Sequence, residues 1–175
     1  NMRSNNKQHE ILRAAFAVVA EQGANRLTID AVAAESGFSK GGVLYHFSSK
    51  KALLSGMLDY LVSVNVSRVE EQKDNHLLTR MIAARQATDK AERRSTLALL
   101  TAFAEDTRLL EPARSQMNEL FRESVDTKTE KEEAATLFFA NEGLRFLQLF
   151  DLCPLNHQAT RKLTGYLTEQ AENLR

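Results

Sequence analysis

The chain of 175 residues is long enough for one or two compact domains, and its composition (43% apolar, 26% charged) is ordinary for a soluble globular protein. Its single cysteine, Cys153, excludes an intrachain disulfide and suits the reducing cytosol, where we expect the protein to reside. The formal charge is zero, but residues 1–51 carry a net +3 and the remainder −3, a weak indication that the N-terminal part contacts a polyanion. No apolar run is long enough to cross a bilayer, so we expect no membrane partner.

Apolar residues recur at helical spacing through almost the whole chain, and no segment shows the alternation of a strand. The first helix should end at Gly23, a residue type that favours helix C-termini. Thr28 has the right chemistry to cap a short helix that closes at Gly37, and Ser39 to cap another that runs through Phe47. These three helices account for the first 47 residues.

Further helices follow along the chain. Ser48 or Ser49 should open a long one over 50–71, and the polar stretch 72–92 has no clear helix boundaries. Pro112 stands where a first-turn proline would begin a helix. Other helices are predicted over 93–106, 134–152 and 155–174. The sequence therefore predicts an all-α fold of about nine helices, four of them in the first third.

Residues 28–51 have the proportions of a DNA-binding helix-turn-helix, two short helices joined by a turn at Gly37. At about 100° per residue, Val43 and Phe47 share one side of the second short helix and should face the core. The opposite side carries two residues without side chains and two with hydrogen-bonding tips, namely Gly41, Gly42, Tyr45 and His46.

Four residues in this segment cost local helix stability. Gly41 and Gly42 in a first helical turn each lose about 1 kcal/mol relative to alanine. Lys50 and Lys51 oppose the macrodipole at a helix N-terminus by about 0.3–1 kcal/mol each. A polyanion lying against this side explains all four residues, because glycine allows close backbone approach and free amides with a lysine bind phosphate.

The segment resembles the TetR family of one-component repressors. The matching residues are Thr28-Ile29, Val32-Ala33, Ser36-Gly37, Ser39-Lys40-Gly41, Leu44-Tyr45-His46-Phe47, Lys50 and Leu53. The strong match covers roughly residues 8–58. The resemblance implies a three-helix DNA-binding domain with a helix-turn-helix, a long connecting helix, and a divergent C-terminal helical domain.

The resemblance also implies roles for single residues. Thr28 would contact a phosphate, and Ser39, Lys40 and Gly41 would open the recognition helix against the major groove. Tyr45, His46 and Lys50 would contact backbone phosphates.

Position 42 departs from the family pattern, because Gly42 stands where many relatives carry a larger side chain that can read bases. Direct readout would then depend on Lys40, backbone approach and the Leu44 methyls, with DNA shape adding more. Two other interpretations remain open: His46 could be a core histidine, and Lys50 with Lys51 a solvated charge pair.

The segment 134–152 is apolar nearly all round, so a helix there must be covered on several sides. Pairing it with the final helix across a two-fold axis would make a homodimer, as the family does; a central helix of a monomer is the alternative. A single short recognition helix also favours a dimer. Two copies about 34–36 Å apart would reach successive major grooves of a pseudo-palindromic double-stranded operator.

The helices between carry apolar residues, some of which should, by the resemblance, line a pocket for a small-molecule effector. The candidate ligand-binding residues are Val64, Leu99, Phe103, Asn141 and Arg145. Arg145 could hold an anionic group, or it could simply pair with Glu142 at i, i+3. An apolar or amphipathic effector is expected.

No metal site is predicted, since His9, His76 and His157 lack metal-ligand spacing. No Ser-His-Asp order, phosphate loop or carboxylate pair indicates catalysis or a cofactor, so the chain is not expected to be an enzyme. We expect a bacterial, cytoplasmic repressor with a DNA-binding head at 1–50 and a sensing and dimerising body at 51–175. Effector binding would shift the connecting helix and change the spacing of the two recognition helices. The alternative is a helical enzyme or adaptor with a vestigial head.

Overall fold

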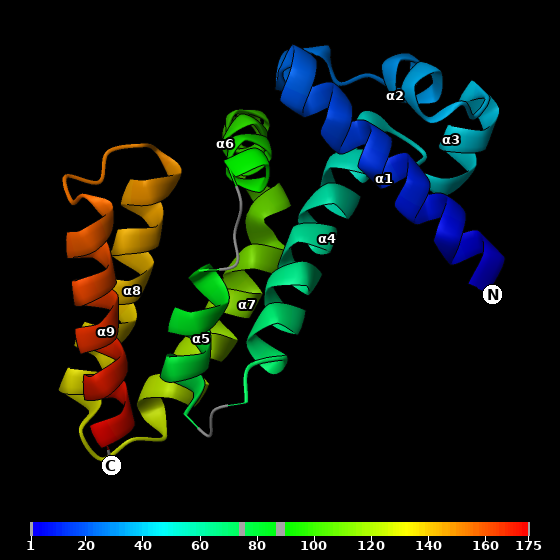
Figure 1. Ribbon diagram of the computed structural model, residues 1–175. Helices are drawn as coiled ribbons and strands as arrows, with labels where there is room; N and C mark the ends of the chain where they lie inside the picture. Colours follow the sequence, from blue (N-terminus) through cyan, green and yellow to red (C-terminus); the bar gives the residue numbers. More distant parts are fainter. Residues whose placement is uncertain (1, 74–75, 87–89, 175) are drawn as a thin grey trace. The chain divides into compact units, whose positions relative to one another are not determined.

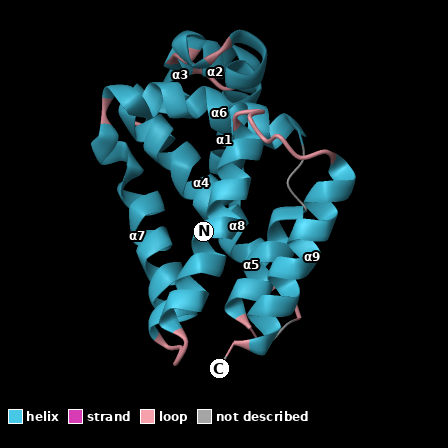
Figure 2. Cartoon of the chain, turned by 90° about the vertical axis from the view of Figure 1, so that its left-hand side faces the viewer, coloured by secondary structure: helices cyan, strands magenta, loops and turns pink. Residues whose placement is uncertain are grey.

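The computed structural model describes residues 2–73, 76–86 and 90–174, and throughout these residues the secondary structure is helical, with no strand (Figures 1 and 2). The α-helices within this part of the chain are α1 (Met2–Gln22), α2 (Ile29–Ser36), α3 (Lys40–His46), α4 (Lys50–Glu70), α5 (Leu77–Gln86), α6 (Lys90–Glu105), α7 (Glu111–Phe121), α8 (Lys131–Leu149) and α9 (His157–Asn173). Short 3₁₀ turns, η1 (Ala24–Arg26) and η2 (Thr107–Leu110), and a π-helical turn, η3 (Arg122–Asp126), lie between them. The predicted all-α fold is confirmed.

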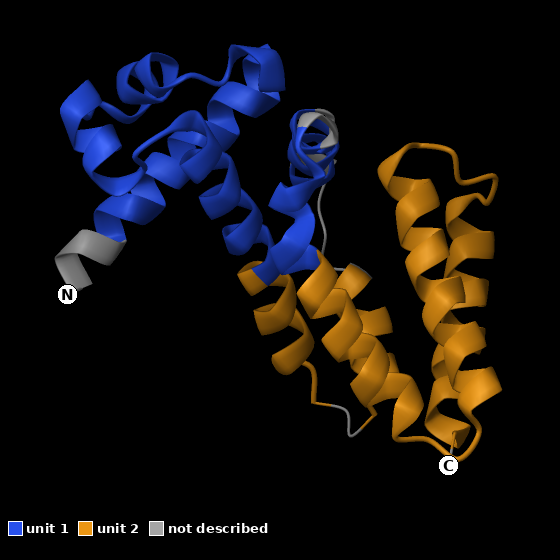
Figure 3. Cartoon of the chain, turned by 180° about the vertical axis from the view of Figure 1, so that it is seen from behind, with its two compact units in different colours: residues 1–62, 90–113 blue, residues 63–89, 114–175 orange. Residues whose placement is uncertain are grey.

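The chain divides into two compact units (Figure 3). Unit 1 comprises residues 1–62 and 90–113, and unit 2 comprises residues 63–89 and 114–175. Helix α4 begins in the first unit and ends in the second. The predicted domains at 1–50 and 51–175 separate DNA contact from sensing, whereas these units group residues by packing. The functional boundary therefore stays a prediction.

The core of unit 1 joins the N-terminal helices to α6. Helix α1 packs against α2 and against α6. The fully buried side chains that fill the space between these helices include Ile11, Val18, Leu27, Val32, Val43, Leu53, Met57, Leu99 and Phe103. Their periodic spacing in the sequence places them on inward faces, so burial of apolar area is what holds this unit together.

Two glycines allow the turns of this unit. Gly23 after α1 has φ 87°, and Gly37 after α2 has φ 72°, both in the region that side chains disfavour. The predicted helix ends at Gly23 and Gly37 are thus confirmed.

Unit 2 is built around α5, α8, α9 and the π-helical turn, with α5 in contact with both α8 and α9. Its buried core contains Leu78, Ile82, Leu120, Val125, Phe138, Leu144 and Leu167, among others. Helix α5 occupies part of the polar stretch 72–92, for which no helix boundaries could be predicted. Helix α8 begins and ends three residues earlier than predicted. It ends early because Asp151 turns the chain with φ 56° before Pro154 is reached.

Candidate nucleic-acid interface

The two short helices of the head begin at side-chain caps. The Thr28 hydroxyl accepts a hydrogen bond from the Ala31 amide at 3.0 Å, and the Ser39 hydroxyl accepts one from the Gly42 amide at 3.0 Å. Both predicted caps are confirmed. A cap takes one of the four amides that a helix N-terminus leaves without helical acceptors, so the first turns of α2 and α3 keep donors for an anion.

Helix α3 has one buried side and one exposed side. Val43 is 0% exposed and Phe47 is 3% exposed, whereas Tyr45 is 83% exposed. His46 is half-buried, and its ring meets that of Tyr45 edge-on at 5.2 Å between centroids. His46 is therefore not a core histidine. The predicted orientation of this helix is confirmed.

Leu44 and the two glycines complete the exposed side, which we call the recognition face. Leu44 is 37% exposed and Gly41 is exposed. A Cβ at position 41 would meet only the Ser39 Oγ, at 4.0 Å, but one at position 42 would lie 3.3 Å from that oxygen. A larger side chain at position 42 would therefore press on the capping hydroxyl, while position 41 is open.

The inner side of α3 is locked by contact with α4. A Cβ built on Gly56 of α4 would lie 2.5 Å from Cε1 of Phe47, which is closer than real Cβ atoms approach. Phe47 is also the C-cap residue of α3. Glycine at position 56 thus lets the ring seat against α4 and fixes the end of the recognition helix.

Lys40, the first residue of α3, is paired with Asp30 of α2. Its Nζ lies 3.0 Å from the Asp30 carboxylate, and both side chains are well exposed, at 60% and 69%. An exposed ion pair of this kind contributes about 0–1 kcal/mol to stability, so it orients Lys40 more than it stabilises the fold. Nothing in the local sequence pattern pointed to Asp30.

The two lysines at the start of α4 have different surroundings. Lys50 is exposed and forms no ion pair with a described residue. Lys51 Nζ lies 2.8 Å from Asp106 Oδ2, and the guanidinium of Arg108 holds the same carboxylate at 2.8 Å and 3.0 Å. The two are thus not a simple solvated pair.

The Arg108 guanidinium and the Lys51 ammonium hold the pKa of Asp106 well below its usual range. The same contact raises the pKa of Arg108. We call Lys51, Asp106 and Arg108 the charged triad. It ties the start of α4 to the end of α6, a link that spans 55 residues and left no sequence signal.

The five predicted ligand-binding residues do not fall in one compact unit. Leu99 and Phe103 belong to unit 1, where they are 0% and 2% exposed and form part of its core. Val64, Asn141 and Arg145 belong to unit 2, and Val64 is half-buried. Their role in ligand binding stays a prediction.

Asn141 and Arg145 already have partners inside unit 2. Asn141 is buried and accepts hydrogen bonds from Arg85 through Oδ1 at 2.8 Å and through its carbonyl at 2.5 Å. Arg145 Nε donates to Glu142 Oε2 at 2.9 Å. The i, i+3 pair with Glu142 is therefore formed. Cys153 is half-buried and not bonded to another cysteine.

No cluster of histidine, cysteine and acidic side chains suited to a metal ion occurs in the part of the chain that the structure describes. Nor is any helix within those residues both long and apolar enough to cross a membrane.

Two family models match the chain. Residues 11–57 match the bacterial regulatory proteins of the tetR family, and residues 74–172 match the tetracyclin repressor-like C-terminal domain. The first match contains every predicted DNA-contact residue.

Curated relatives include the HTH-type transcriptional regulator YerO of Bacillus subtilis, 30% identical over 71 residues, which cover 41% of this chain and 25% of YerO. The nucleoid occlusion factor SlmA of Vibrio vulnificus is 29% identical over 141 residues, 72% of this chain and 66% of SlmA. The matched segments thus span a quarter of YerO and about two thirds of SlmA.

Solved structures share the fold along nearly the whole chain. The multidrug binding protein EbrR complexed with malachite green superposes with a TM-score of 0.72 at 16% identity, covering 94% of this chain and 96% of EbrR. Salmonella enterica GusR superposes with a TM-score of 0.68 at 17% identity, covering 95% of this chain and 96% of GusR. A transcriptional regulator from Rhodococcus sp. Rha1 gives 0.69 at 22% identity, covering 94% of each chain.

Both family models, the helix-turn-helix with its capped helices, and the shared fold agree. The chain belongs to the TetR family of transcriptional regulators, which are DNA-binding proteins rather than enzymes.

Proposed function

We propose that this chain is a homodimeric repressor of the bacterial cytoplasm that binds a pseudo-palindromic operator and leaves it when a small apolar or amphipathic molecule binds. One observation carries the proposal: α3 buries Val43 and Phe47 and turns Tyr45 to solvent, with 83% of that residue exposed. An exposed aromatic hydroxyl beside a histidine at a helix with free N-terminal amides suits a phosphate chain.

The DNA contacts divide into positioning and reading. Thr28, Tyr45, His46 and Lys50 contact phosphates and fix the register of the head on the duplex. The start of α3, with Ser39, Lys40, Gly41 and Gly42, enters the major groove together with Leu44. Because Lys40 is held by Asp30, its ammonium is presented in one direction.

Alanine at Tyr45, His46 or Lys50 should weaken binding to any DNA sequence. The affinity should also depend less on salt. The slope of log K against log salt concentration should become less steep by roughly 0.9 for each phosphate that the variant no longer neutralises. The measurement is a titration of DNA by fluorescence anisotropy at several salt concentrations. Lys131→Ala is a matched control, since Lys131 is an exposed lysine of unit 2. Parent-like binding by all three variants would refute the assignment.

The dimer is proposed to form through α8 and α9, which pack against each other within unit 2. Their outer surface is unusually apolar for a solvated face. Exposed large apolar side chains there are Phe139, Phe146, Leu147 and Tyr166, and Leu152 and Leu155 are exposed in the connection between the two helices. Phe139, Phe146 and Leu147 share one stripe of α8 by their spacing, and exposed apolar patches of this kind mark interfaces.

Phe146→Lys should convert the dimer to a monomer in sedimentation velocity, because a charge would replace an aromatic ring that is 57% exposed in the single chain. Glu133→Lys is the control, since Glu133 is exposed in the first turn of the same helix. A monomeric parent protein without affinity for DNA at low salt would favour the adaptor alternative instead.

Release from the operator is proposed to follow from a shift of α4. This helix begins directly after the recognition helix and continues into unit 2, so a ligand that prefers one position of α4 would bias the spacing of the two heads. The likeness to a multidrug binding protein supports an effector of this chemical class. Screening dyes and apolar drugs against the protein–operator complex tests this; an effector that binds without changing operator affinity would contradict it.

A further inference from the structure

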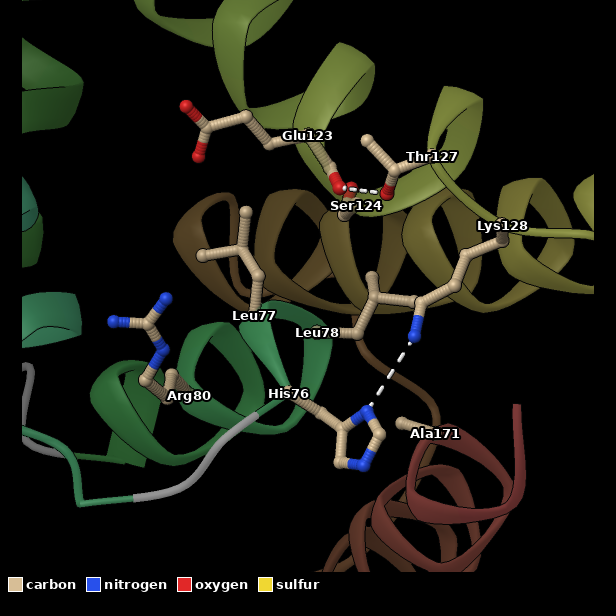
Figure 4. A pocket seen from close by; sticks show the side chains of 9 residues that line it. All are labelled: His76, Leu77, Leu78, Arg80, Glu123, Ser124, Thr127, Lys128 and Ala171. Atoms are coloured by element: carbon tan, nitrogen blue, oxygen red, sulfur yellow. Dashed lines mark hydrogen bonds between the residues drawn. The ribbon is translucent and has the colours of Figure 1, made fainter. Parts of the chain in front are cut away.

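Unit 2 contains a cavity of about 340 Å³ that none of the predicted ligand-binding residues lines. It lies between the start of α5, the π-helical turn η3 with the residues after it, and the last turns of α9 (Figure 4). Its wall includes Leu77, Leu78, Arg80, Lys128 and Ala171. Pockets for small molecules range over about 300–1,000 Å³, so this one would hold a small ligand.

Arg80 in this wall lacks a partner for a buried donor. Its Nε is inaccessible to solvent and has no hydrogen-bond acceptor among the described residues. The guanidinium also forms no ion pair with a described residue. Arg80 as a whole is half-buried, so its charge keeps some solvent, but a buried N–H donor left unsatisfied is rare in folded proteins, and a bound anion would satisfy it.

The first turn of α5 adds donors at the same place. The helix begins at Leu77, and the Arg80 amide is the first to reach a carbonyl of the preceding turn, that of His76, at 3.1 Å. The amides before it belong to the group that a helix N-terminus leaves without helical acceptors, and the positive end of the macrodipole lies there. These two features favour a negative charge near Arg80.

The opposite end of the cavity is closed by Lys128 and His76, whose Nζ and Nδ1 lie 3.4 Å apart. Figure 4 shows this pair on one side, Arg80 on the other, and Leu77 with Leu78 between them. The Glu123 carboxylate points away from Lys128 and toward the side on which Arg80 lies, so it competes there with a bound anion. With one carboxylate against two cationic side chains, the wall carries a net charge of about +1, which matches a monoanion better than a dianion.

The π-helical turn shapes the remaining wall. The Ser124 hydroxyl donates to the Leu120 carbonyl at 2.6 Å, and the Thr127 hydroxyl donates to the Glu123 carbonyl at 2.6 Å. Because their hydrogens are used within the turn, these hydroxyls offer only acceptor lone pairs to the cavity. Such turns occur often at functional sites.

We propose that this cavity binds a small organic monocarboxylate. The carboxylate is held by Arg80 and the first turn of α5, and the hydrocarbon part lies against Leu77, Leu78 and Ala171. The site is a property of unit 2 and does not depend on whether its ligand controls DNA binding, so it can fail without refuting the proposed repressor function.

The experiment titrates the full chain with hexanoate at constant ionic strength, by calorimetry and by amide chemical shifts. Hexylamine, inorganic phosphate and chloride are the comparison probes. Saturable binding of one hexanoate per chain is expected, with shift changes at the amides of Leu77 to Arg80 and at Ser124 to Lys128.

Three variants locate the binding. Arg80→Leu should lower hexanoate affinity about tenfold to hundredfold, the equivalent of a lost charged hydrogen bond. Arg122→Leu is the matched control, since Arg122 is exposed in the adjoining turn outside the cavity wall, and should leave affinity unchanged. Glu123→Gln should tighten hexanoate binding, because it removes a like charge from the wall.

Loss of binding in Arg80→Leu must come without loss of fold. Removing an unsatisfied buried donor should leave the thermal midpoint unchanged or raise it. The proposal is overturned by any of four results: no saturable hexanoate binding up to about 10 mM (about 2.7 kcal/mol), equal affinity of parent and Arg80→Leu, tighter binding of phosphate than of hexanoate, or tighter binding of hexylamine.

Discussion

The head and the cavity wall of unit 2 are both made of short helical turns, but their hydrogen bonds span very different distances along the chain. In the head, the hydroxyl groups of Thr28, Ser39 and Ser49 each accept a hydrogen bond from the backbone amide three residues later, at the start of a helix. In unit 2, the π-helical turn of the cavity wall also has local bonds, but Lys128 reaches His76 over 52 residues, and outside the wall Arg85 reaches Asn141 over 56. The head is thus specified locally, whereas the cavity exists only once distant segments have packed.

The largest effect is expected at Gly56, because the head, although specified locally, depends there on the close contact between α4 and the ring of Phe47. Gly56→Ala should lower the free energy of unfolding by about 1–3 kcal/mol, since its methyl would overlap the buried ring of Phe47. Chemical denaturation measures this. Gly41→Ala is the control and should raise stability by up to about 1 kcal/mol, because that position is open.

If Gly56→Ala proved as stable as the parent, the contact between α3 and α4 would not fix the recognition helix. An accompanying loss of DNA affinity is expected in Gly56→Ala, as the end of α3 is displaced.

Next, Ser39→Asp separates the structural role of the cap from contact with DNA. Aspartate caps a helix as well as serine, so stability should change by less than about 0.5 kcal/mol. A carboxylate placed against phosphate should lower operator affinity about tenfold or more. Urea unfolding and anisotropy titration measure the two effects. Unchanged DNA affinity would remove the start of α3 from the interface.

The charged triad is the long-range exception within unit 1, and its effect depends on pH. The pKa of Asp106 is depressed in the folded chain, so its contribution to stability is present above the unfolded value of about 4 and is lost as the pH falls below it. Asp106→Asn should therefore be less stable than the parent at pH 7. Thermal midpoints of both proteins should converge as the pH is lowered through the acid range.

The smallest effect is expected at Asp30. Asp30→Asn frees Lys40 and removes a negative charge near the recognition face, so nonspecific DNA affinity should rise a few-fold while stability changes by less than about 1 kcal/mol. Competition titrations with operator and random DNA would show reduced discrimination between them. Unchanged discrimination would mean that the ion pair does not direct Lys40.

The part of the fold that the sequence could predict follows the same division. The caps at Thr28 and Ser39 and the turn at Gly37 use residue types whose backbone chemistry is nearly self-sufficient, so both the helices and the recognition face could be placed. Helix α5 could not be bounded, because its apolar residues acquire an inward face only through contact with α8 and α9.

The site residues divide likewise. The orientation of Tyr45 and His46 could be deduced from helical period alone. The partners Asp30 and Asp106 could not, since they lie 10 and 55 residues from their lysines and no periodicity relates them. The cavity was beyond sequence reasoning for the same reason, because its wall combines three separate segments.

The packing of α6 against α1 has a consequence for protein engineering. Residues 90–113 belong to the same compact unit as the first 62, and they supply Leu99 and Phe103 to its core. A fragment cut after α4, or a chimaera that grafts this reading module onto a foreign sensor, would leave that interior open to water. Exchange between regulators would have to transplant two stretches of sequence together, even though only the first of them carries the proposed operator contacts.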